Sequence, residues 1–216
     1  MSSLLTALLS ALPLMAGWAV HAWCLRARLH TARRDPLTGL RTRDGFTRRA
    51  TRLIKDPRAV VVLADVDRFK QINDRHGHAV GDALLKATAD RLARHVGASG
   101  VAGRLGGDEF AAVVIDDHGT AADLLAVLHG RLARPVDGLA PEVHTTVSLG
   151  WVRAEDFPGD DLSGLLGRAD VAMYAAKQGR AGLRRAGLGR LFATVRGRRS
   201  GRHGARTDVP VIGVAA

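Results

Sequence analysis

Two acidic side chains follow a pair of glycines near the middle of the chain, in the order Gly106, Gly107, Asp108 and Glu109. The apolar stretches 101–105 and 110–115 on either side predict the buried strands of a hairpin, with positive φ at both glycines of its turn. The two acids then lie at the hairpin tip, where adjacent carboxylates repel each other unless a cation or a proton donor stabilises them. This arrangement suits a divalent-metal site for a nucleoside triphosphate, although the spacing alone also allows a hairpin turn with solvated acids.

A second group of acids follows the β-branched run 60–64, which predicts a buried strand. Strand periodicity places Asp65 and Asp67 on the same side of the chain. A carboxylate at the end of a buried strand costs desolvation energy unless a cation or hydrogen bonds compensate it, so Asp65 is a natural metal ligand. Asp67 is better interpreted as a helix N-cap or a turn acid.

Residues that suit purine recognition come next, at Asn73 and Asp82, with glycines between them. Amide and carboxylate groups pair with the donors and acceptors of a purine edge, and Asp82 could accept from N1–H and N2–H₂ of guanine. By itself, Asp82 before an apolar helix would be interpreted as an N-cap. Lys70 and Lys177 are candidate phosphate contacts, with solvated surface charges as the alternative.

The rest of the chain alternates helical and strand patterns. The predicted helices cover 46–54, 84–96, 121–132 and 162–173, and the predicted strands cover 60–64, 143–152 and the hairpin. This order gives an α/β domain with an antiparallel hairpin inside it. The segment after residue 180 is rich in Gly, Ala and Arg, and we expect it to be loosely ordered, with 191–195 as a candidate edge strand.

The net charge of +11 comes from the two ends of the chain. Residues 1–34 contain four arginines and no acid, and residues 181–216 contain eight arginines and one acid. The segment 35–180 contains 20 basic and 20 acidic residues and is therefore neutral. Nucleic-acid-binding domains carry positive charge on the folded part together with aromatic residues, which make up only 4% here, so we expect no nucleic-acid partner.

The N-terminal segment 4–24 contains no Lys, Arg, Asp or Glu, and about 20 such residues suffice to cross a hydrocarbon core as a helix. Arginines follow this segment and none precedes it, so the positive-inside rule places the rest of the chain in the cytoplasm. A cleaved signal peptide and an amphipathic helix in the plane of the membrane are the alternatives. The single cysteine, Cys24, excludes an intrachain disulfide and fits a reducing compartment.

Together, these motifs resemble the GGDEF family of diguanylate cyclases from Asp35 to about Arg180, in the family's order and, through Tyr174, at familiar spacing. The motifs are Asp-Pro-Leu-Thr-Gly-Leu at 35–40, Asp-Val-Asp-Arg-Phe-Lys-Gln-Ile-Asn-Asp at 65–74, Gly-His at 77–78, Gly-Asp at 81–82, Gly-Gly-Asp-Glu-Phe at 106–110, Thr-Val-Ser-Leu-Gly at 146–150, Ala-Asp at 169–170, Met-Tyr at 173–174 and Ala-Lys at 176–177. The resemblance implies a mixed α/β sheet with flanking helices, similar to nucleotidyl cyclases and polymerase palms, that carries a GGDEF hairpin and follows the transmembrane helix.

The resemblance also implies that the protein condenses two GTP molecules into cyclic di-GMP and releases pyrophosphate, with each subunit of a homodimer presenting one GTP. By motif position, Asp65, the Val66 carbonyl and Asp108 would ligate Mg²⁺ or Mn²⁺. Glu109 would assist deprotonation of the attacking 3′-hydroxyl or share a metal. The substrate contacts implied are Asn73 and Asp82 to guanine, Lys70 and Lys177 to phosphate, and Gly106 and Gly107 in the turn.

Three departures from the family pattern matter. Gly97 and Gly100 occupy the positions at which many members carry the Arg and Asp of an inhibitory product site, so we expect no feedback inhibition through that site. Thr42 replaces the usual Asn and is predicted to cap a helix. The loop that follows Lys177 is one residue shorter than usual, which leaves the register of Arg180 open.

The predicted organisation is a transmembrane helix in 1–25, a short basic cytoplasmic linker in 26–34, a catalytic domain in 35–180 and a basic tail in 181–216. We expect a single-pass diguanylate cyclase of the cell membrane with its catalytic domain in the cytoplasm. The shortened loop supports an alternative, a catalytically degenerate member that binds GTP or protein partners as a regulator. A third interpretation is a membrane-surface protein whose basic tail binds anionic lipid at ~1 kcal/mol per residue, with a solvated tail as its own alternative.

Overall fold

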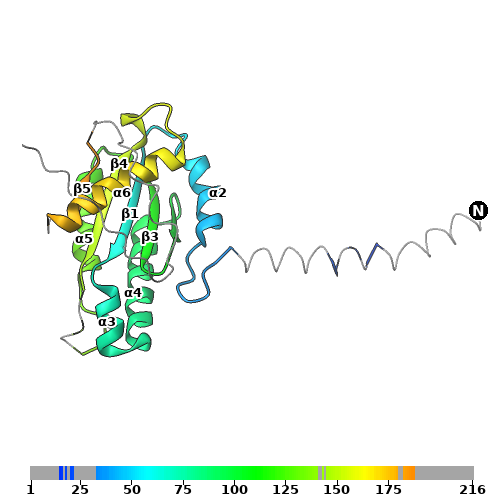
Figure 1. Ribbon diagram of the computed structural model, residues 1–216. Helices are drawn as coiled ribbons and strands as arrows, with labels where there is room; N and C mark the ends of the chain where they lie inside the picture. The colour runs from blue at the N-terminus through cyan, green and yellow to red at the C-terminus, as the bar shows by residue number, and fades with distance from the viewer. Residues whose placement is uncertain are drawn as a thin grey trace, which may run out of the picture.

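A single five-stranded sheet forms the centre of the domain (Figure 1). The computed structural model describes residues 15–16, 18, 20–21, 33–140, 143, 145–179 and 182–187. The strands are β1 (Ala59–Val66), β2 (Val101–Arg104), β3 (Glu109–Ile115), β4 (Val147–Arg153) and β5 (Leu183–Arg185), in the order β2-β3-β1-β4-β5. Every pairing is antiparallel except that of β4 with β5. The predicted mixed sheet is thereby confirmed.

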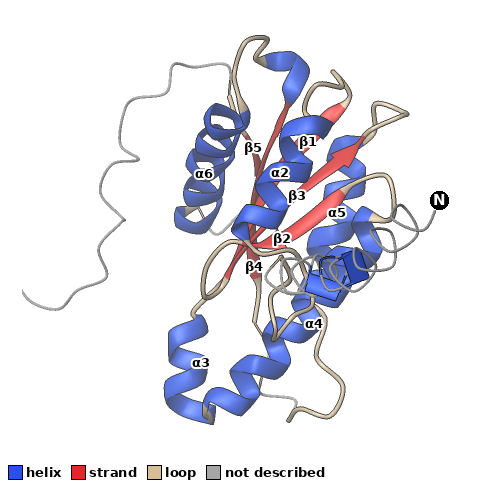
Figure 2. Cartoon of the chain, turned by 90° about the vertical axis from the view of Figure 1, so that its right-hand side faces the viewer, coloured by secondary structure: helices blue, strands red, loops and turns tan. Residues whose placement is uncertain are grey.

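Helices cover both faces of this sheet (Figure 2). They are α2 (Arg43–Leu53), α3 (Phe69–His76), α4 (His78–Val96), α5 (Ala121–Leu132), α6 (Leu162–Gln178) and the short 3₁₀ helix η1 (Ala154–Asp156). Apolar residues of α2 and α6 pack on one face, and those of α4 and α5 pack on the other. The pair α3 and the first turns of α4 extend beyond one end of the sheet (Figure 1).

The central strand β1 is buried on both faces because its side chains alternate between two hydrophobic layers. Val60 and Val62 face α4 and α5, whereas Val61 and Leu63 face α2 and α6. In β4, a Cβ added at Gly150 would lie 2.1 Å from the carbonyl oxygen of Ala169 in α6. The missing side chain therefore lets α6 lie directly on the sheet.

Element bounds differ from the sequence expectations at several places. The helix predicted over 84–96 begins at His78, and the strand predicted over 143–152 begins at Val147. Strand β5 lies in the segment that we assigned to the tail, while the candidate strand 191–195 lies outside the described residues. Thr42 is the N-cap of α2 and accepts from the Gly45 N–H at 3.4 Å, which confirms its predicted role.

The prediction of positive φ in the hairpin turn is wrong, because neither Gly106 nor Gly107 has one. Four residues separate β2 from β3, and the Leu105 N–H closes the loop by donating to the Glu109 carbonyl at 2.8 Å. A loop of this length spreads the chain reversal over more residues than a two-residue turn does. The glycines are therefore not required for left-handed conformations.

The membrane prediction concerns residues that the structure largely leaves undescribed. The segment 4–24 lies outside the described residues except at positions 15–16, 18 and 20–21. Among the residues that are described, no helix combines the length and apolar character needed to span a bilayer.

Candidate active site

Three of the predicted acidic residues meet where β1 lies beside β3. The register of the two strands places Asp65 directly opposite Glu109. The Val66 N–H donates to the Asp108 carbonyl at 3.2 Å, which ties the end of β1 to the hairpin loop. Directly opposed residues in an antiparallel pair have Cβ atoms about 4.5–5.5 Å apart, so these carboxylates act on one another. We call Asp65, Asp108 and Glu109 the acidic centre.

The acidic centre carries more negative charge than its surroundings compensate. Burial raises the pKa of Asp65, and the neighbouring carboxylates of Asp108 and Asp67 raise it further, against the opposing effect of Lys177. Burial also raises the pKa of Glu109, with Asp65, Asp108 and Asp170 adding to the shift and Arg43 opposing it. Both shifts mean that the charged carboxylates are disfavoured and that an added cation would stabilise them.

Lys177 supplies the direct positive contact to this centre. It lies in the last turn of α6, and its Nζ is 2.5 Å from Oδ1 of Asp65, a carboxylate that is only 13% exposed. The shortened loop after α6 therefore does not keep Lys177 from the site. Arg180, whose register the sequence left open, lies outside the described residues.

Two arginines bind the backbone carbonyls of the hairpin loop, and the sequence analysis did not select either of them as a site residue. The Arg104 guanidinium donates to the carbonyls of Gly106 at 3.1 Å and Gly107 at 2.7 and 3.1 Å, and pairs with Asp35 at 3.0 Å. Arg43 in α2 donates to the Leu105 carbonyl at 2.7 and 3.1 Å. The sequence signal for them was only their position. Arg104 stands just before Leu105 and the paired glycines, and Arg43 follows the motif 35–40 by three residues.

The glycines of this loop differ in what surrounds them. A Cβ added at Gly106 would lie 3.0 Å from Oε2 of Glu109, so a side chain there would press on the carboxylate. At Gly107 nothing lies within 4 Å of an added Cβ. Gly106 leaves room for Glu109, and Gly107 leaves an open approach to the loop backbone.

Asp67 is a turn acid, which was one of its two predicted roles, and not a helix N-cap. Its carboxylate accepts from the hydroxyls of Thr146 at 2.5 Å and Ser148 at 2.7 Å, and its backbone carbonyl accepts from Thr145 at 2.6 Å. The N-cap of α3 is instead Arg68, which has a left-handed φ of 55° and no side-chain cap bond. These bonds fix the reversal between β1 and α3, directly after the buried Val66 that ends the strand.

The two predicted guanine-binding residues lie on α3 and α4. The Asn73 Oδ1 is buried and has no hydrogen-bond partner among the described residues, so it is an acceptor without a donor. A Cβ added at Gly81 would lie 1.9 Å from this oxygen, which shows why glycine faces Asn73. Asp82 is exposed within α4, whose N-cap is Gly77, so its interpretation as an N-cap is wrong. Lys70 is exposed in the first turn of α3.

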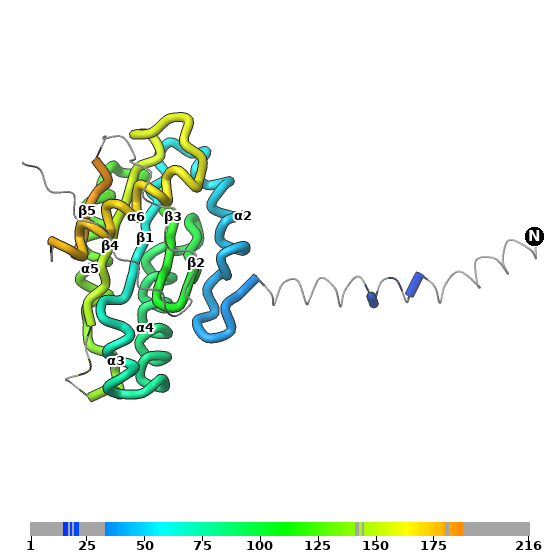
Figure 3. The backbone as a smooth tube through the Cα atoms, viewed as in Figure 1, coloured from blue at the N-terminus to red at the C-terminus, as the bar shows by residue number. Residues whose placement is uncertain are grey.

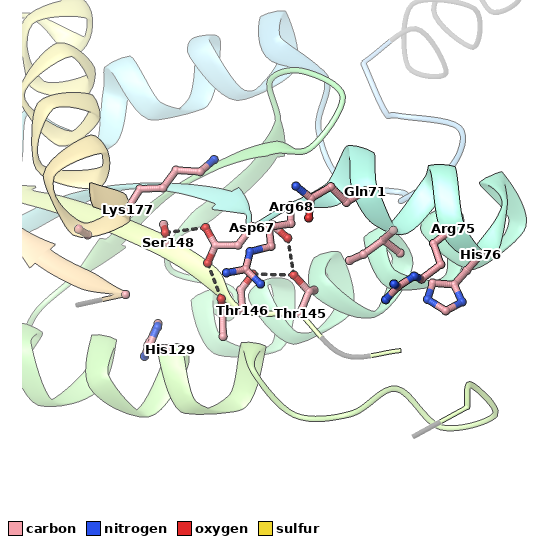
Figure 4. Close-up of a pocket in the computed structure, with 13 residues that line it drawn as sticks. Asp67, Arg68, Gln71, Arg75, His76, His129, Thr145, Thr146, Ser148 and Lys177 are labelled. Carbon is pink, nitrogen blue, oxygen red and sulfur yellow. Dashed lines mark hydrogen bonds between the residues drawn. The ribbon is translucent and has the colours of Figure 1, made fainter. Parts of the chain in front are cut away.

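A large cavity of about 1020 Å³ lies beside the acidic centre, between α3, β4 and α6 (Figure 4). Its polar lining includes Asp67, Arg68, Gln71, Arg75, His76, His129, Thr145, Thr146, Ser148 and Lys177. Lys177 is the link between this cavity and the acidic centre, because it also contacts Asp65. The acidic centre, Asn73 and Asp82 do not line this cavity, so the candidate site rests on the carboxylate geometry and not on the cavity.

The donor set suits a hard divalent cation that takes part of its ligands from a substrate. Within the described residues, no group of three or more His, Cys, Asp or Glu side chains is arranged to hold a metal unaided. The predicted metal ligands are instead carboxylates together with the Val66 carbonyl, and all of them are oxygen donors. At this place burial and neighbouring carboxylates raise the pKa values of Asp65 and Glu109. Mg²⁺ commonly binds through one or two carboxylates and completes its shell with phosphate oxygens and water.

Comparison with known proteins agrees with this architecture. The family described as diguanylate cyclase, GGDEF domain, matches residues 32–182. An uncharacterized 19.3 kDa protein of Streptomyces ambofaciens is 48% identical over 167 residues, which cover 77% of this chain and 89% of that protein. Diguanylate cyclase TpbB of Pseudomonas aeruginosa is 37% identical over 167 residues, covering 72% of this chain but 38% of TpbB.

A solved structure shows the same fold. The coiled coil and GGDEF domain of DgcB from Caulobacter crescentus, in complex with c-di-GMP, superposes with a TM-score of 0.67 at 26% identity, covering 80% of this chain and 97% of that one. The predicted palm-like sheet and the family resemblance are thereby confirmed. The chain belongs to the GGDEF family of diguanylate cyclases.

Proposed function

We propose that this protein is an active diguanylate cyclase, which joins two GTP molecules into cyclic di-GMP and releases two pyrophosphates. The observation that carries the proposal is the acidic centre, where Asp65 opposes Glu109 on neighbouring strands and Lys177 reaches it from α6. Relatives named diguanylate cyclase support it.

The chemistry is an in-line displacement performed twice. The 3′-oxygen of one GTP forms a bond to the α-phosphorus of the other, the bond to the leaving pyrophosphate breaks, and the hydroxyl proton passes to a base. Glu109 is suited to accept this proton, because its raised pKa brings it closer to neutrality than an ordinary glutamate. A divalent cation held by Asp65, Asp108 and the Val66 carbonyl would neutralise phosphate charge and lower the pKa of the nucleophile.

The remaining residues bind and orient the substrate. Asn73 offers an unsatisfied buried oxygen to the guanine donors, and exposed Asp82 lies on the helix beside it. Lys70 and Lys177 would meet phosphate oxygens, Lys177 by exchanging part of its contact with Asp65 for them. Because one such site holds one GTP, the reaction needs two subunits that face each other. A homodimer, at least a transient one, is therefore part of the proposal.

The membrane anchor is a second part of the proposal, and its support is the apolar composition of segment 4–24. A single span there, with the domain in the cytoplasm, would place product formation at the membrane surface. Carbonate extraction of membranes from cells that express the full chain tests this directly. Retention in the pellet supports a span, and release to the supernatant contradicts it.

The test of the cyclase is turnover of GTP by the full chain in neutral detergent with Mg²⁺, followed by mass-resolved chromatography for cyclic di-GMP. We expect product from the parent and none above background from Glu109→Gln. A matched control is Asp90→Asn, because Asp90 is an exposed acid on α4 away from the site. Equal activity of parent and Glu109→Gln would contradict the proposal.

A degenerate regulator is the alternative, and the pairing of Lys177 with Asp65 favours it. If that pair persisted with GTP bound, Asp65 would be less available to a metal. Measured GTP binding without product, at protein concentrations that give a dimer and with both Mg²⁺ and Mn²⁺, would establish this alternative.

A further inference from the structure

The start of helix α2 packs directly on the strand that leads into the hairpin loop (Figure 3). A Cβ added at Gly103 in β2 would lie 2.6 Å from the Cβ of Phe46 in α2. Glycine at this position therefore allows the helix to approach the strand closely. The segment before α2 is joined to the same strand by its main chain, because the Arg104 N–H donates to the Arg41 carbonyl at 2.8 Å. Strand β2 and the start of α2 are thus held in a fixed relation.

Arg43 extends this contact from α2 to the hairpin loop. It is the first residue of the helix, and its Nη2 and Nε donate to the Leu105 carbonyl at 2.7 and 3.1 Å. The N–H of Leu105 donates in turn to the Glu109 carbonyl at 2.8 Å. A single residue therefore connects the Arg43 side chain with the backbone of Glu109.

The chemistry of the guanidinium group decides how firmly this carbonyl is held. The group is planar, and its N–H donors keep a fixed geometry relative to one another. Two such bonds to one oxygen restrict both the distance and the direction of the Leu105 carbonyl. A lysine ammonium on its flexible stem keeps the charge but cannot impose the same restriction.

Arg43 is also a cation in the neighbourhood of the Glu109 carboxylate. Burial, followed by the charge of Asp65, raises the pKa of Glu109, and the positive charge of Arg43 opposes this rise. The side chain that holds the loop backbone therefore lies close enough to the carboxylate for its charge to be felt there.

We propose that Arg43 is a positioning residue of the cyclase, which holds Leu105 so that Glu109 keeps the place needed to accept the 3′-hydroxyl proton. This inference rests on the proposed function, because it concerns how Glu109 meets the substrate. Arg43 acts through Leu105 and does not belong to the acidic centre. Its task also differs from that of Arg104, whose side chain binds the carbonyls of Gly106 and Gly107 from β2 itself. Arg43 instead couples the loop to a separate element, helix α2.

The experiment is steady-state GTP turnover by the full chain in neutral detergent with Mg²⁺, for the parent, Arg43→Gln and Arg43→Lys. The matched control is Arg52→Gln, because Arg52 is an exposed arginine in the last turn of the same helix. Saturation curves in GTP give kcat and KM separately, and an interaction that matters only in the transition state affects kcat alone. Hydrogen exchange of the peptide 104–110 gives a second measurement that does not depend on activity.

We expect kcat of Arg43→Gln to fall at least about tenfold while KM changes less than about twofold, since a small displacement at a reacting centre is costly. Arg43→Lys should recover little of this loss, and Arg52→Gln should match the parent. The peptide 104–110 should exchange faster in Arg43→Gln than in the parent or in Arg52→Gln. If Arg43→Gln fails to fold by circular dichroism, Arg43→Lys replaces it with the same expected loss in kcat.

The outcomes separate this inference from the proposed function. Product from the parent together with an unchanged kcat in Arg43→Gln would overturn the role of Arg43 alone. A rise in KM without a fall in kcat, or full activity in Arg43→Lys, would overturn it as well, because binding or charge would then account for the residue. Absence of product from the parent would overturn the cyclase and the role of Arg43 with it.

Discussion

Arg104→Ala should damage both stability and turnover, although Arg104 is not part of the acidic centre. The Arg104 side chain is 15% exposed and Asp35 is 19% exposed, so water screens their ion pair weakly. The substitution also removes the donors to the carbonyls of Gly106 and Gly107. Hydrogen bonds to charged groups contribute about 1.5–3 kcal/mol each and are not additive, so we expect the free energy of unfolding to fall by about 2–4 kcal/mol.

The effect on catalysis follows from the position of the loop. Arg104 holds the two residues immediately before Asp108 and Glu109, and a displacement of about 1 Å in such a site costs about 100-fold in rate. Arg104→Lys keeps the charge but loses the fork, so we expect it to recover part of the stability and little of the turnover.

Urea denaturation and steady-state GTP turnover on the same preparations test this reasoning. The control is Arg58→Ala. Like Arg104, Arg58 forms ion pairs with aspartate, in its case with Asp56 and Asp117, but its side chain is exposed, and exposed ion pairs contribute little to stability. If Arg104→Ala unfolds at the parent's urea midpoint and retains its rate, or if Arg58→Ala is as damaging, the role assigned to Arg104 is wrong.

Four further predictions concern other parts of the domain. Glu109→Gln should raise the melting temperature at pH 7.5 and leave it unchanged near pH 3.5. The pKa of Glu109 is raised above about 4.5, so the native state holds the proton of this carboxyl group more tightly than the unfolded chain does. The parent therefore loses stability as the pH rises through the raised pKa, whereas glutamine does not titrate. Gly81→Ala should raise the KM for GTP several-fold with a smaller change in kcat, since its methyl group would displace the Asn73 oxygen, and an unchanged KM would refute that contact. Asp116→Asn should cost about 2 kcal/mol in urea denaturation, because Asp116 accepts from two backbone N–H groups at the start of α5 at 2.9 Å and pairs with an arginine. Cyclic di-GMP added to the turnover assay should not slow the initial rate, because Gly97 and Gly100 offer no side chain where many family members carry the Arg and Asp of the inhibitory product site. Strong inhibition would contradict this.

The acids of the acidic centre could be selected from sequence by their places at the ends of apolar runs, and the family resemblance implied that Asp65 and Asp108 share a metal. Asp65 ends a continuous β-branched run and Glu109 begins the next, so pairing the two strands brings the carboxylates together. The hydrophobic layers follow from the same alternation. Helix ends were less predictable: α4 starts at His78 after Gly77 and has no side-chain cap, so no start signal in the sequence marked its first turn.

Contacts between distant residues could not be read from the sequence. The pairing of Lys177 with Asp65 joins residues 112 positions apart, and the pairing of Arg104 with Asp35 joins residues 69 apart. Neither has a local signature, because a lysine or arginine in isolation is most often a solvated charge. For the hairpin glycines, a local signature was present but misleading. The Gly-Gly pair is typical of a two-residue turn with left-handed φ, whereas the four-residue loop reverses the chain without left-handed φ at either glycine.

The distribution of charge links these observations. The acidic centre concentrates carboxylates whose pKa values are raised, and a concave surface at α2 is lined by Arg33, Arg41, Arg48, Arg49 and Arg52 and, among the described residues, by no acid. Net charge over 35–180 is zero, so sequence composition conceals both clusters. The carboxylates of the acidic centre disfavour one another's charge, and a bound cation would relieve this. Mg²⁺ should therefore raise the melting temperature of the parent but not of Asp65→Asn, because Asp65 is one of the two carboxylates assigned to the cation. An equal rise in both proteins would contradict that assignment.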